Sequence, residues 1–403
     1  MTLSYTREHF HCRACGTNLP PPYLNLGEQP LANALLTEPT DEELTFPLAV
    51  TLCPRCGLSQ LTTVVDPAIL YKDYAFQSGA SGAWTEHAER LAGHWQLRDP
   101  GFVVDIAAND GSQLKAFHER GWRCVGVEPA SMASVVDVPF VRRFFDQSVA
   151  NDIVAQHGHP SLIVAQNVVG HVDDVVGFLV ACASLLDRNG AIAIEVPHID
   201  ELTASVAFDT IYHEHLSYWS GYPLSLCAEK AGLEVEDIER LTVHGGSRRY
   251  WLRHRTESRS SKRGGGFAIF QPVISEESYR RFTQRVDDRM RSLRDELDTI
   301  HAAGKRLWAF GASAKGTVML NALKAHGNTV WPECILDDTP TKQGKYSPGV
   351  HLPICPVETL REAQPDVMFI LSWNWTEAIR ARCASMGYTG EYLVGAPHVE
   401  RFS

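Results

Sequence analysis

Two cysteine pairs near the N-terminus, Cys12/Cys15 and Cys53/Cys56, have the residue type and spacing of a metal site. A C-x-x-C turn directs two thiolates at one ion, so two such turns can close a tetrahedral four-sulfur zinc site. The long segment between the pairs costs little, because loop-closure entropy grows slowly with length. A closed four-cysteine shell leaves no open coordination position, so we expect the zinc to hold the fold rather than to catalyse. A redox dithiol, which needs only one pair, and unpaired core thiols are the alternatives.

The segment 103–111 (VVDIAANDG) is a predicted strand that enters a tight turn of small residues and then a helix. Glu128 ends the next apolar run, where a carboxylate can accept hydrogen bonds from both hydroxyls of a ribose. Because the G-x-G-x-x-G fingerprint is missing, S-adenosylmethionine fits this edge better than NAD. A purely structural strand and turn is the alternative. The candidate cofactor-binding residues here are Asp105, Ala107, Asn109, Asp110 and Glu128.

Polar residues also follow the third predicted strand, in the segment 165–171 (AQNVVGH). They come where the apolar run stops, at the carboxyl edge where ligands bind in open α/β sheets. We therefore add Asn167 to the candidate cofactor-binding residues and treat His171 as a candidate site residue. The alternative for His171 is a capping or surface histidine.

The densest cluster of titratable side chains lies in 208–218 (FDTIYHEHLSY). It is not H-E-x-x-H, so two metal-binding histidines one helical turn apart are not expected. An extended backbone would put Tyr212 and Glu214 on one face and His213 and His215 on the other, whereas a turn could bring Tyr212, Glu214 and His215 together. Such a trio could supply a proton acceptor of near-neutral pKa and donors for a developing oxyanion. A solvated polar loop and a metal-binding H-x-H are the alternatives.

Two glycine-containing turns further along the chain are candidate anion sites. His244 begins an H-G-G turn whose small residues let backbone amides approach a ligand, and Arg248 or Arg249 could meet a phosphate. Lys315 lies in GASAKG, which follows a later apolar strand. This segment lacks the P-loop order, but it can form an anion-binding turn with the lysine. Each of these segments also suits a purely structural turn.

Composition and charge exclude several classes of protein. The chain has 403 residues, of which 44% are hydrophobic, a fraction typical of a globular protein. Its net charge of −11 argues against a basic surface for nucleic acid. The first residues hold no apolar signal-peptide core, and no apolar run reaches about 18 residues, so we expect no membrane segment. The other cysteines are scattered singly, as in a reducing compartment, so we expect a cytoplasmic protein.

The pattern of strands and helices predicts how the chain is divided. Residues 1–75 hold both cysteine pairs with little periodicity and are predicted to form a small metal-stapled unit. Over 76–260, short apolar runs alternate with helical segments, which predicts a parallel sheet covered on both faces. The polar, glycine-rich stretch 255–266 is interpreted as a linker or mobile loop. Residues 261–403 contain a long charged helix and then a second, smaller α/β domain.

These motifs, in this order and over nearly the whole chain, resemble the family of S-adenosylmethionine-dependent sugar C-methyltransferases, which act on nucleotide-linked keto-deoxysugars. The matching segments are the two C-x-x-C pairs with LGEQPLAN between them, DIAANDG with VEP, FDTIYHEHLSY, HGGS, FGASAKG, KQGKYSPGVHLPI and LSWNW. The resemblance implies a zinc-binding domain over 1–75, a Rossmann-like class I methyltransferase domain over 76–260 and a second doubly wound α/β domain over 261–403. A nucleotide-diphosphate sugar would lie between the last two.

The resemblance also implies a mechanism. A base removes the acidic proton at C3 of the sugar, next to the C4 ketone, and the enolate attacks the sulfonium methyl group in line. By its position in the motif, His215 is the base. Glu214 and Tyr212 would orient the substrate and stabilise the enolate, and His171 would line the active site. Because the α-proton of a ketone is far less acidic than histidine, donors around the base matter as much as the base itself.

One stretch departs from the family pattern, which has a Y-x-Y-x-S-type segment near the active site. Here the stretch is 74–78 (YAFQS), and Phe76 lacks the hydroxyl of the second tyrosine. Either Tyr74 takes that role, or the substrate or the methylated carbon differs. The residues expected to bind substrate are Tyr74, Phe76, His244, Arg248 and Lys315.

Three other functions compete with sugar C-methylation. The first is methyl transfer to another carbon, or to oxygen or nitrogen of a different small molecule, which needs no enolate chemistry at the oxygen or nitrogen. The second is a non-catalytic protein that binds a nucleotide sugar with its last domain alone. The third is a hydrolase that uses the H-x-H segment and a second metal ion.

Overall fold

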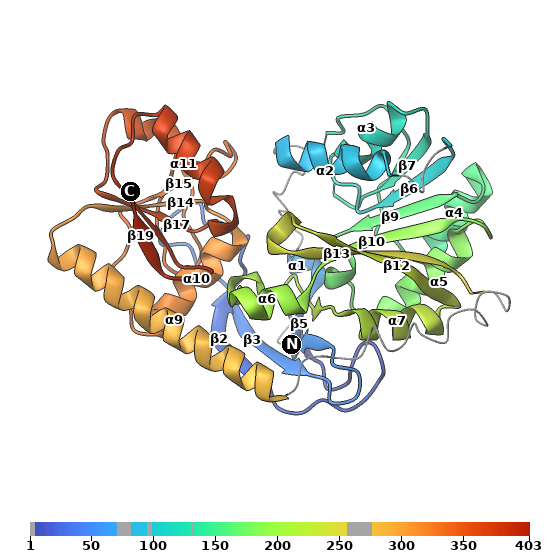
Figure 1. Cartoon of the computed structure of the whole chain (residues 1–403), viewed down its shortest axis with the longest axis horizontal. Helices are drawn as coiled ribbons and strands as arrows, with labels where there is room; N and C mark the ends of the chain where they lie inside the picture. Colours follow the sequence, from blue (N-terminus) through green and yellow to red (C-terminus); the bar gives the residue numbers. More distant parts are fainter. Residues whose placement is uncertain (1–4, 71–81, 95–98, 131–132, 256–275) are drawn as a thin grey trace.

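The computed structural model describes residues 5–70, 82–94, 99–130, 133–255 and 276–403. Two α/β units lie side by side, and the N-terminal strands lie at the lower centre, beneath both of them (Figure 1). The fold class expected from the sequence is therefore confirmed. Among the described helices, none combines the length and the apolar character that crossing a membrane requires.

The N-terminal part consists of short antiparallel strands, although its sequence predicted little regular structure. Its main sheet has the order β11-β4-β3-β2, and β1 pairs with β5 in a separate ribbon. Several of these strands have only three residues, too few for an alternating pattern to be recognised in the sequence. The bounds are β1 (Thr6–Glu8), β2 (Leu24–Pro30), β3 (Thr45–Leu52), β4 (Ser59–Leu61), β5 (Thr63–Val65), α1 (Pro67–Leu70) and β11 (Ser217–Tyr218).

The central unit is a seven-stranded sheet with the order β12-β13-β10-β9-β6-β7-β8. The sequence predicted a parallel sheet, and β13 is the exception because it runs antiparallel to both of its neighbours. The connection between β12 and β13 contains only the short turn η4 (Val243–Gly245), and a short connection joins antiparallel strands. The strands are β6 (Phe102–Ile106), β7 (Arg123–Val127), β8 (Phe140–Val141), β9 (Leu162–Gln166), β10 (Ala191–Pro197), β12 (Leu233–Leu241) and β13 (Ser247–His254).

The order of strands along this sheet reverses at β6, since β7 and β8 lie on one side of it and β9 and β10 on the other. In open α/β sheets, ligands bind at the carboxyl ends of the strands at such a reversal. The tips of β6, β7 and β9 are therefore the expected place for the cofactor. The helices of this unit are α2 (Gly82–Ala92), α3 (Ser112–His118), α4 (Gln147–His157), η2 (Val169–His171), α5 (Val175–Leu185), α6 (Ile199–Ser205), η3 (Phe208–Thr210) and α7 (Gly221–Lys230).

The C-terminal unit repeats this architecture in a six-stranded sheet with the order β16-β15-β14-β17-β18-β19. The order reverses at β14, as in a doubly wound sheet. Among the six strands described for this sheet, only the last, at its edge, runs antiparallel to its neighbour. The elements are α9 (Glu276–Ala302), β14 (Leu307–Phe310), α10 (Ala314–Ala325), β15 (Ile335–Leu336), β16 (Ile354–Cys355), η6 (Val357–Arg361), β17 (Val367–Ile370), η7 (Trp373–Trp375), α11 (Thr376–Ser385), β18 (Glu391–Val394) and β19 (Glu400–Phe402).

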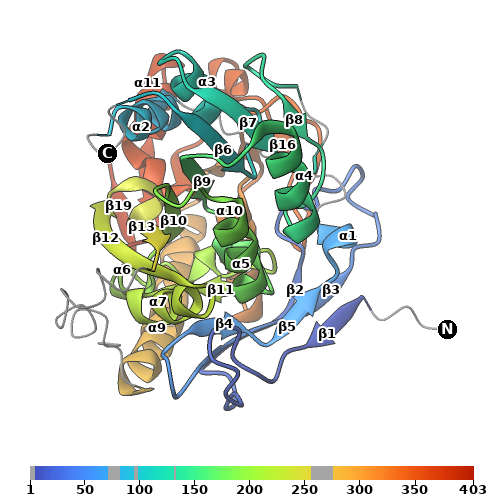
Figure 2. The same cartoon turned by 90° about the vertical axis from the view of Figure 1, so that its right-hand side faces the viewer.

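The long helix α9 ties the parts of the molecule together. Its buried side chains recur every three or four residues, which is the pattern of a helix with one apolar face. That face belongs to a core cluster that also contains the N-terminal strands, the segment 199–218 and the C-terminal sheet. The segment that carries the H-E-H motif is thus packed between the N- and C-terminal parts, and its strand β11 lies beside β4 near the bottom of the molecule (Figure 2).

Candidate functional site

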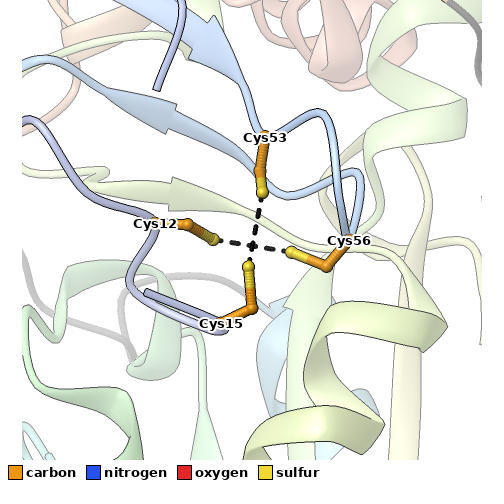
Figure 3. A group of neighbouring side chains, drawn as sticks. All are labelled: Cys12, Cys15, Cys53 and Cys56. Carbon is orange, nitrogen blue, oxygen red and sulfur yellow. Dashed lines mark hydrogen bonds between the residues drawn. The ribbon is translucent and has the colours of Figure 1, made fainter. Parts of the chain in front are cut away.

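The four predicted zinc ligands come together in space. All four Sγ atoms lie within 4.8 Å of one another, with 3.5 Å between Cys12 and Cys56 and 3.4 Å between Cys15 and Cys53. They point at one shared centre (Figure 3). A tetrahedral zinc ion about 2.3 Å from each sulfur requires sulfur–sulfur separations of about 3.8 Å. The donor set and its spacing therefore fit a zinc ion bound by four thiolates.

Both knuckles close with the same backbone turn. The amide of Gly16 donates to the carbonyl of Cys12 at 2.8 Å, and the amide of Gly57 donates to the carbonyl of Cys53 at 3.0 Å. The two glycines have φ of +78° and +73°, a left-handed conformation that glycine adopts without steric cost. Three of the four cysteines are buried, so the site is closed, as expected of a structural zinc site.

Glu128 joins the tips of the first two strands of the central sheet. Its Oε2 accepts a hydrogen bond from the backbone amide of Asn109 at 3.0 Å, and its Oε1 accepts one from the amide of Ala130 at 2.9 Å. The turn after β6 is tight, with φ of +58° at Ala107 and +52° at Asn109. Each carboxylate oxygen can accept a further hydrogen bond, so the pair of oxygens fits the two hydroxyls of a ribose.

Three more predicted cofactor residues lie around this turn. Asn167 directly follows β9, and its buried Oδ1 has no hydrogen-bond partner among the described residues, which suits an acceptor for a bound ligand. Asp110 accepts hydrogen bonds from the amide and hydroxyl of Ser112, at 3.1 and 2.6 Å, at the start of α3. Asp105 is buried inside β6, where burial and the nearby Glu128 raise its pKa well above the ordinary value.

A turn brings Tyr212 and His215 together. The amide of His215 donates to the carbonyl of Tyr212 at 2.9 Å, and the Tyr212 Oη lies 2.8 Å from Nε2 of His215. Nδ1 of the same ring lies 2.8 Å from the carbonyl of Thr210. A carbonyl oxygen can only accept, so Nδ1 carries a hydrogen, and in the neutral tautomer Nε2 then holds the lone pair. In that tautomer the hydroxyl of Tyr212 donates to Nε2.

His171 lies beside this pair. Its ring meets the ring of His215 edge-on, with the centroids 4.9 Å apart and the planes at 86°. Burial lowers the pKa of His171 to about 4, so the ring is neutral at neutral pH and adds no positive charge next to His215. His171 lies in the segment that follows β9 and carries Asn167, so the His215 ring meets this segment.

The other two members of the H-E-H motif face the N-terminal part. Glu214 is buried and its Oε1 accepts a hydrogen bond from Nδ2 of Asn33 at 2.7 Å. Burial raises the pKa of Glu214 to about 7. His213 is buried with Nε2 3.2 Å from the carbonyl of Phe46, and burial lowers its pKa to about 4. The expected trio is therefore divided, because the structure unites Tyr212 with the second histidine and pairs Glu214 with Asn33.

Lys315 of the C-terminal unit is connected through Trp373 to the segment 208–218. Its Nζ lies 4.9 Å from the ring centroid of Trp373, whose Nε1 donates to Oδ2 of Asp209 at 2.7 Å. Asp209 is fully buried in η3, shortly before the tyrosine of the turn, and its Oδ1 has no hydrogen-bond partner in the described part of the chain. A Cβ placed on Gly245 of the H-G-G turn would lie 3.5 Å from the Trp373 ring. Four of the sequence motifs, FDTIYHEHLSY, HGGS, FGASAKG and LSWNW, therefore meet at one place.

The remaining predicted substrate residues lie apart or outside the described residues. Arg248 is the second residue of β13, and its Nη2 donates to Oε1 of Glu201 at 3.1 Å. His244 belongs to η4, and its side chain is not among those described. Tyr74 and Phe76 fall outside the described residues, so their roles stay predictions.

A buried charged network beside the carboxyl ends of β9 and β10 was missed by the sequence analysis. Oε2 of Glu195 lies 2.6 Å from Nε2 of His87, and Oε1 accepts from Nε of Arg249 at 2.6 Å. Nη1 of Arg249 also donates to Glu239 at 2.9 Å. The signal in the sequence was a glutamate and an arginine within two apolar strands, and these residues are paired across β10 and β13. Arg249 is committed to this network, which corrects its interpretation as a phosphate ligand.

Three family models match the chain. A zinc binding domain matches residues 12–71, a methyltransferase domain matches residues 76–238, and a C-methyltransferase C-terminal domain matches residues 242–397. Together they cover most of the chain and follow the order of the three parts seen in the structure.

Known proteins resemble the chain over different lengths. C-methyltransferase NovU of Streptomyces niveus is 31% identical over 386 residues, which cover 91% of this chain and 90% of that protein. Among solved structures, a 1,6-didemethyltoxoflavin N1-methyltransferase of Burkholderia thailandensis has a TM-score of 0.34 at 20% identity and covers 43% of this chain and 82% of its own. The glycopeptide N-methyltransferase MtfA has a TM-score of 0.34 at 14% identity and covers 45% of this chain and 98% of its own.

The fold, the cofactor edge and the four-cysteine cluster define an S-adenosylmethionine-dependent methyltransferase with a zinc-binding domain. The chain is similar to NovU, a C-methyltransferase, over nearly the full length of both proteins, which indicates that the methyl group is transferred to carbon. The chain belongs to the C-methyltransferase family.

Proposed function

We propose that this enzyme methylates a carbon next to the ketone of a nucleotide-linked 4-keto-deoxysugar, at C3, with His215 as the base. The observation that carries the proposal is the hydrogen bonding of the His215 ring, with Nδ1 donating to Thr210 and Nε2 accepting from Tyr212 at 2.8 Å. This arrangement keeps a neutral imidazole in a fixed orientation with its lone pair on one defined atom. A general base requires both properties.

The Tyr212 hydroxyl has a second role in this proposal. When Nε2 of His215 takes the C3 proton, the C–H electron pair becomes the enolate and Nε2 can no longer accept a hydrogen bond. The protonated ring then donates to the Tyr212 oxygen, and the phenolic hydrogen is released toward the enolate oxygen. The donor is thus available only once negative charge has developed, which lowers the barrier of the ionisation step.

The cofactor-binding residues align the acceptor with the methyl donor. S-adenosylmethionine, when bound, supplies an electrophilic methyl group. Glu128 would hold the ribose through its two carboxylate oxygens, and Asn167 would accept a hydrogen bond through its Oδ1, which has no partner within the described ranges. Asn167 and His171 follow the same strand, and the ring of His171 meets the ring of His215, so the cofactor segment lies beside the proposed base. Methyl transfer to a carbanion requires mainly such alignment.

The group around Lys315 supports a nucleotide-diphosphate sugar as the acceptor. A lysine ammonium binds phosphate as a point charge, and the Trp373 ring beside it offers a flat apolar face to a base or a sugar. Asp209 holds the indole through a hydrogen bond of 2.7 Å, so this group is connected to the segment that carries Tyr212. Arg248 can add a second cation if the substrate displaces Glu201 from it.

The proposal is tested by incubating the enzyme with S-adenosylmethionine and a panel of 4-keto-6-deoxy nucleotide sugars. We expect the product to gain one methyl group on C3, located by mass spectrometry and NMR. A methyl group on oxygen or nitrogen would contradict the proposal. Binding of the nucleotide sugars in calorimetry without binding of S-adenosylmethionine would contradict it in favour of a non-catalytic binding protein.

A further inference from the structure

Arg13 occupies a special place in the first cysteine knuckle. It lies between Cys12 and Cys15, and its backbone amide donates to Oε1 of Gln60 at 3.0 Å. Its side chain has no exposed surface. A buried guanidinium is costly unless hydrogen-bond acceptors surround it.

The guanidinium of Arg13 contacts both segments that carry the catalytic histidines. Its Nη1 donates to the carbonyl of Leu216 at 3.2 Å, and Leu216 directly follows His215. Its Nε donates to Oδ1 of Asp173 at 2.9 Å, and Asp173 lies two residues after His171. One side chain thus joins the two backbone segments whose histidine rings meet edge-on.

The second cysteine knuckle reaches the same place by another route. Strand β4 begins three residues after Cys56 and pairs with β11, which begins two residues after His215. The amide of Leu61 donates to the carbonyl of Leu216 at 3.0 Å, and Nη1 of Arg13 donates to the carbonyl of Leu61 at 3.2 Å. Both knuckles are therefore connected to the peptide that directly follows the base.

We propose that Arg13 is a positioning residue that couples the zinc knuckles to the His171–His215 pair. The planar guanidinium directs N–H groups of Nε and Nη1 in fixed directions and so holds two carbonyls and a carboxylate at once, whereas an ammonium group presents rotatable donors from a single nitrogen. A zinc ion bound by the four thiolates would fix the backbone of Arg13 and hence the spacing of the two histidine segments. This inference rests on the proposed function, in which these histidines surround the reacting carbon.

The test compares Arg13→Lys with Arg55→Lys. The control residue Arg55 lies in the second knuckle, next to Cys56, and is exposed. Each full-length variant is first checked for bound zinc and for its affinity for S-adenosylmethionine, and both should match the parent protein. The ring signals of His171 and His215 are then followed by NMR of protein labelled in histidine, and hydrogen exchange of the Leu61 amide is measured.

In Arg13→Lys we expect shifted histidine signals, exchange of the Leu61 amide at least about tenfold faster, and kcat at least about tenfold lower with little change in KM for the cofactor. Arg55→Lys should match the parent protein in every measurement. Should Arg13→Lys fail to fold, Asp173→Ala serves as the second variant, because it removes the carboxylate that accepts from Nε of Arg13 without altering the knuckle. It should shift the signals of His171 at unchanged zinc content.

Two outcomes separate this inference from the proposed function. Histidine signals and Leu61 exchange that stay as in the parent protein would overturn the role of Arg13, whatever the turnover. Shifted histidine signals with unchanged turnover would support the coupling and would contradict the catalytic role proposed for the histidines.

Discussion

The hydroxyl of Tyr212 donates to Nε2 of His215 across 2.8 Å, while Nδ1 of the same ring donates to the backbone carbonyl of Thr210. The tautomer of the histidine is therefore set by a backbone group, and its basic nitrogen is paired with a donor that can be released later. In the mechanism that we propose, this pair would supply the two requirements of carbanion chemistry, a proton acceptor and a hydrogen-bond donor for the oxyanion.

Removing the Tyr212 hydroxyl should show how much this hydrogen-bond donor contributes to the rate. We expect Tyr212→Phe to lower kcat by about 10²-fold, the usual cost of losing one oxyanion donor, with the KM for S-adenosylmethionine unchanged. Steady-state kinetics measures both values. Tyr392→Phe, which removes the same group from β18 in the C-terminal sheet, is the control and should leave both unchanged. Full activity in Tyr212→Phe would show that the phenol takes no part in the reaction.

Glu214 should make the stability of the protein depend on pH. Burial raises its pKa from 4.5 to about 7, so the folded state binds the proton more tightly than the unfolded chain. The stabilisation relative to an ionised carboxylate is complete below the unfolded pKa and is lost as the pH rises through about 7. We expect the free energy of unfolding of the parent protein to fall by about 2–3 kcal/mol relative to Glu214→Gln between about pH 5 and pH 8.

Urea unfolding of both proteins at the two pH values measures this difference. Glu119→Gln, an exposed carboxylate at the end of α3, is the matched control and should track the parent protein. Parallel stability curves for the parent protein and Glu214→Gln would mean that Glu214 is ionised in the folded state.

The cofactor assignment depends on Glu128. In Glu128→Gln, one carboxylate oxygen becomes an amide nitrogen that cannot accept from a ribose hydroxyl or from the Asn109 amide. We expect S-adenosylmethionine to bind about 10- to 100-fold more weakly, since a hydrogen bond to a charged group contributes about 1.5–3 kcal/mol. Isothermal titration calorimetry measures the Kd, with Glu119→Gln as the control. An unchanged Kd would refute the ribose assignment.

The zinc site should be structural and single. We expect metal analysis to find one zinc ion per chain, and Cys53→Ser to lose it together with several degrees of Tm, because the metal stabilises the folded state. Cys355→Ser, which changes a half-buried cysteine of β16 outside the cluster, should keep the ion. A second zinc ion that persists in Cys53→Ser would contradict a purely structural role of zinc and would support a metal site at the H-x-H segment.

Features carried by local spacing could be predicted from the sequence. The two C-x-x-C pairs identified the zinc ligands because each knuckle is built within four residues. The apolar runs identified β6, β7, β9 and β10 of the central sheet and β14, β15 and β17 of the C-terminal sheet, and the long charged pattern identified α9, because burial imposes a period on each element. The exception in the central sheet was the direction of β13, which follows from the length of a connection rather than from any periodicity.

Contacts between distant segments could not be predicted in the same way. Glu214 is paired with Asn33, and β11 joins a sheet whose other strands lie more than 150 residues earlier. A polar residue carries no mark of its partner until the fold brings the two together. Similarly, His87 lay within an ordinary helical pattern, and only the structure shows that it is buried against Glu195.

The most direct test of His215 as the base is the exchange of the C3 proton of a 4-keto-6-deoxy nucleotide sugar with D₂O. NMR monitors this exchange in the absence of methyl transfer. The parent enzyme and His118→Asn, an exposed histidine of α3, should catalyse the exchange. His215→Asn should abolish it while still binding S-adenosylmethionine with the parent affinity, because the proton acceptor is gone and the cofactor edge is intact. Exchange at the parent rate in His215→Asn would contradict the assignment of His215 as the base.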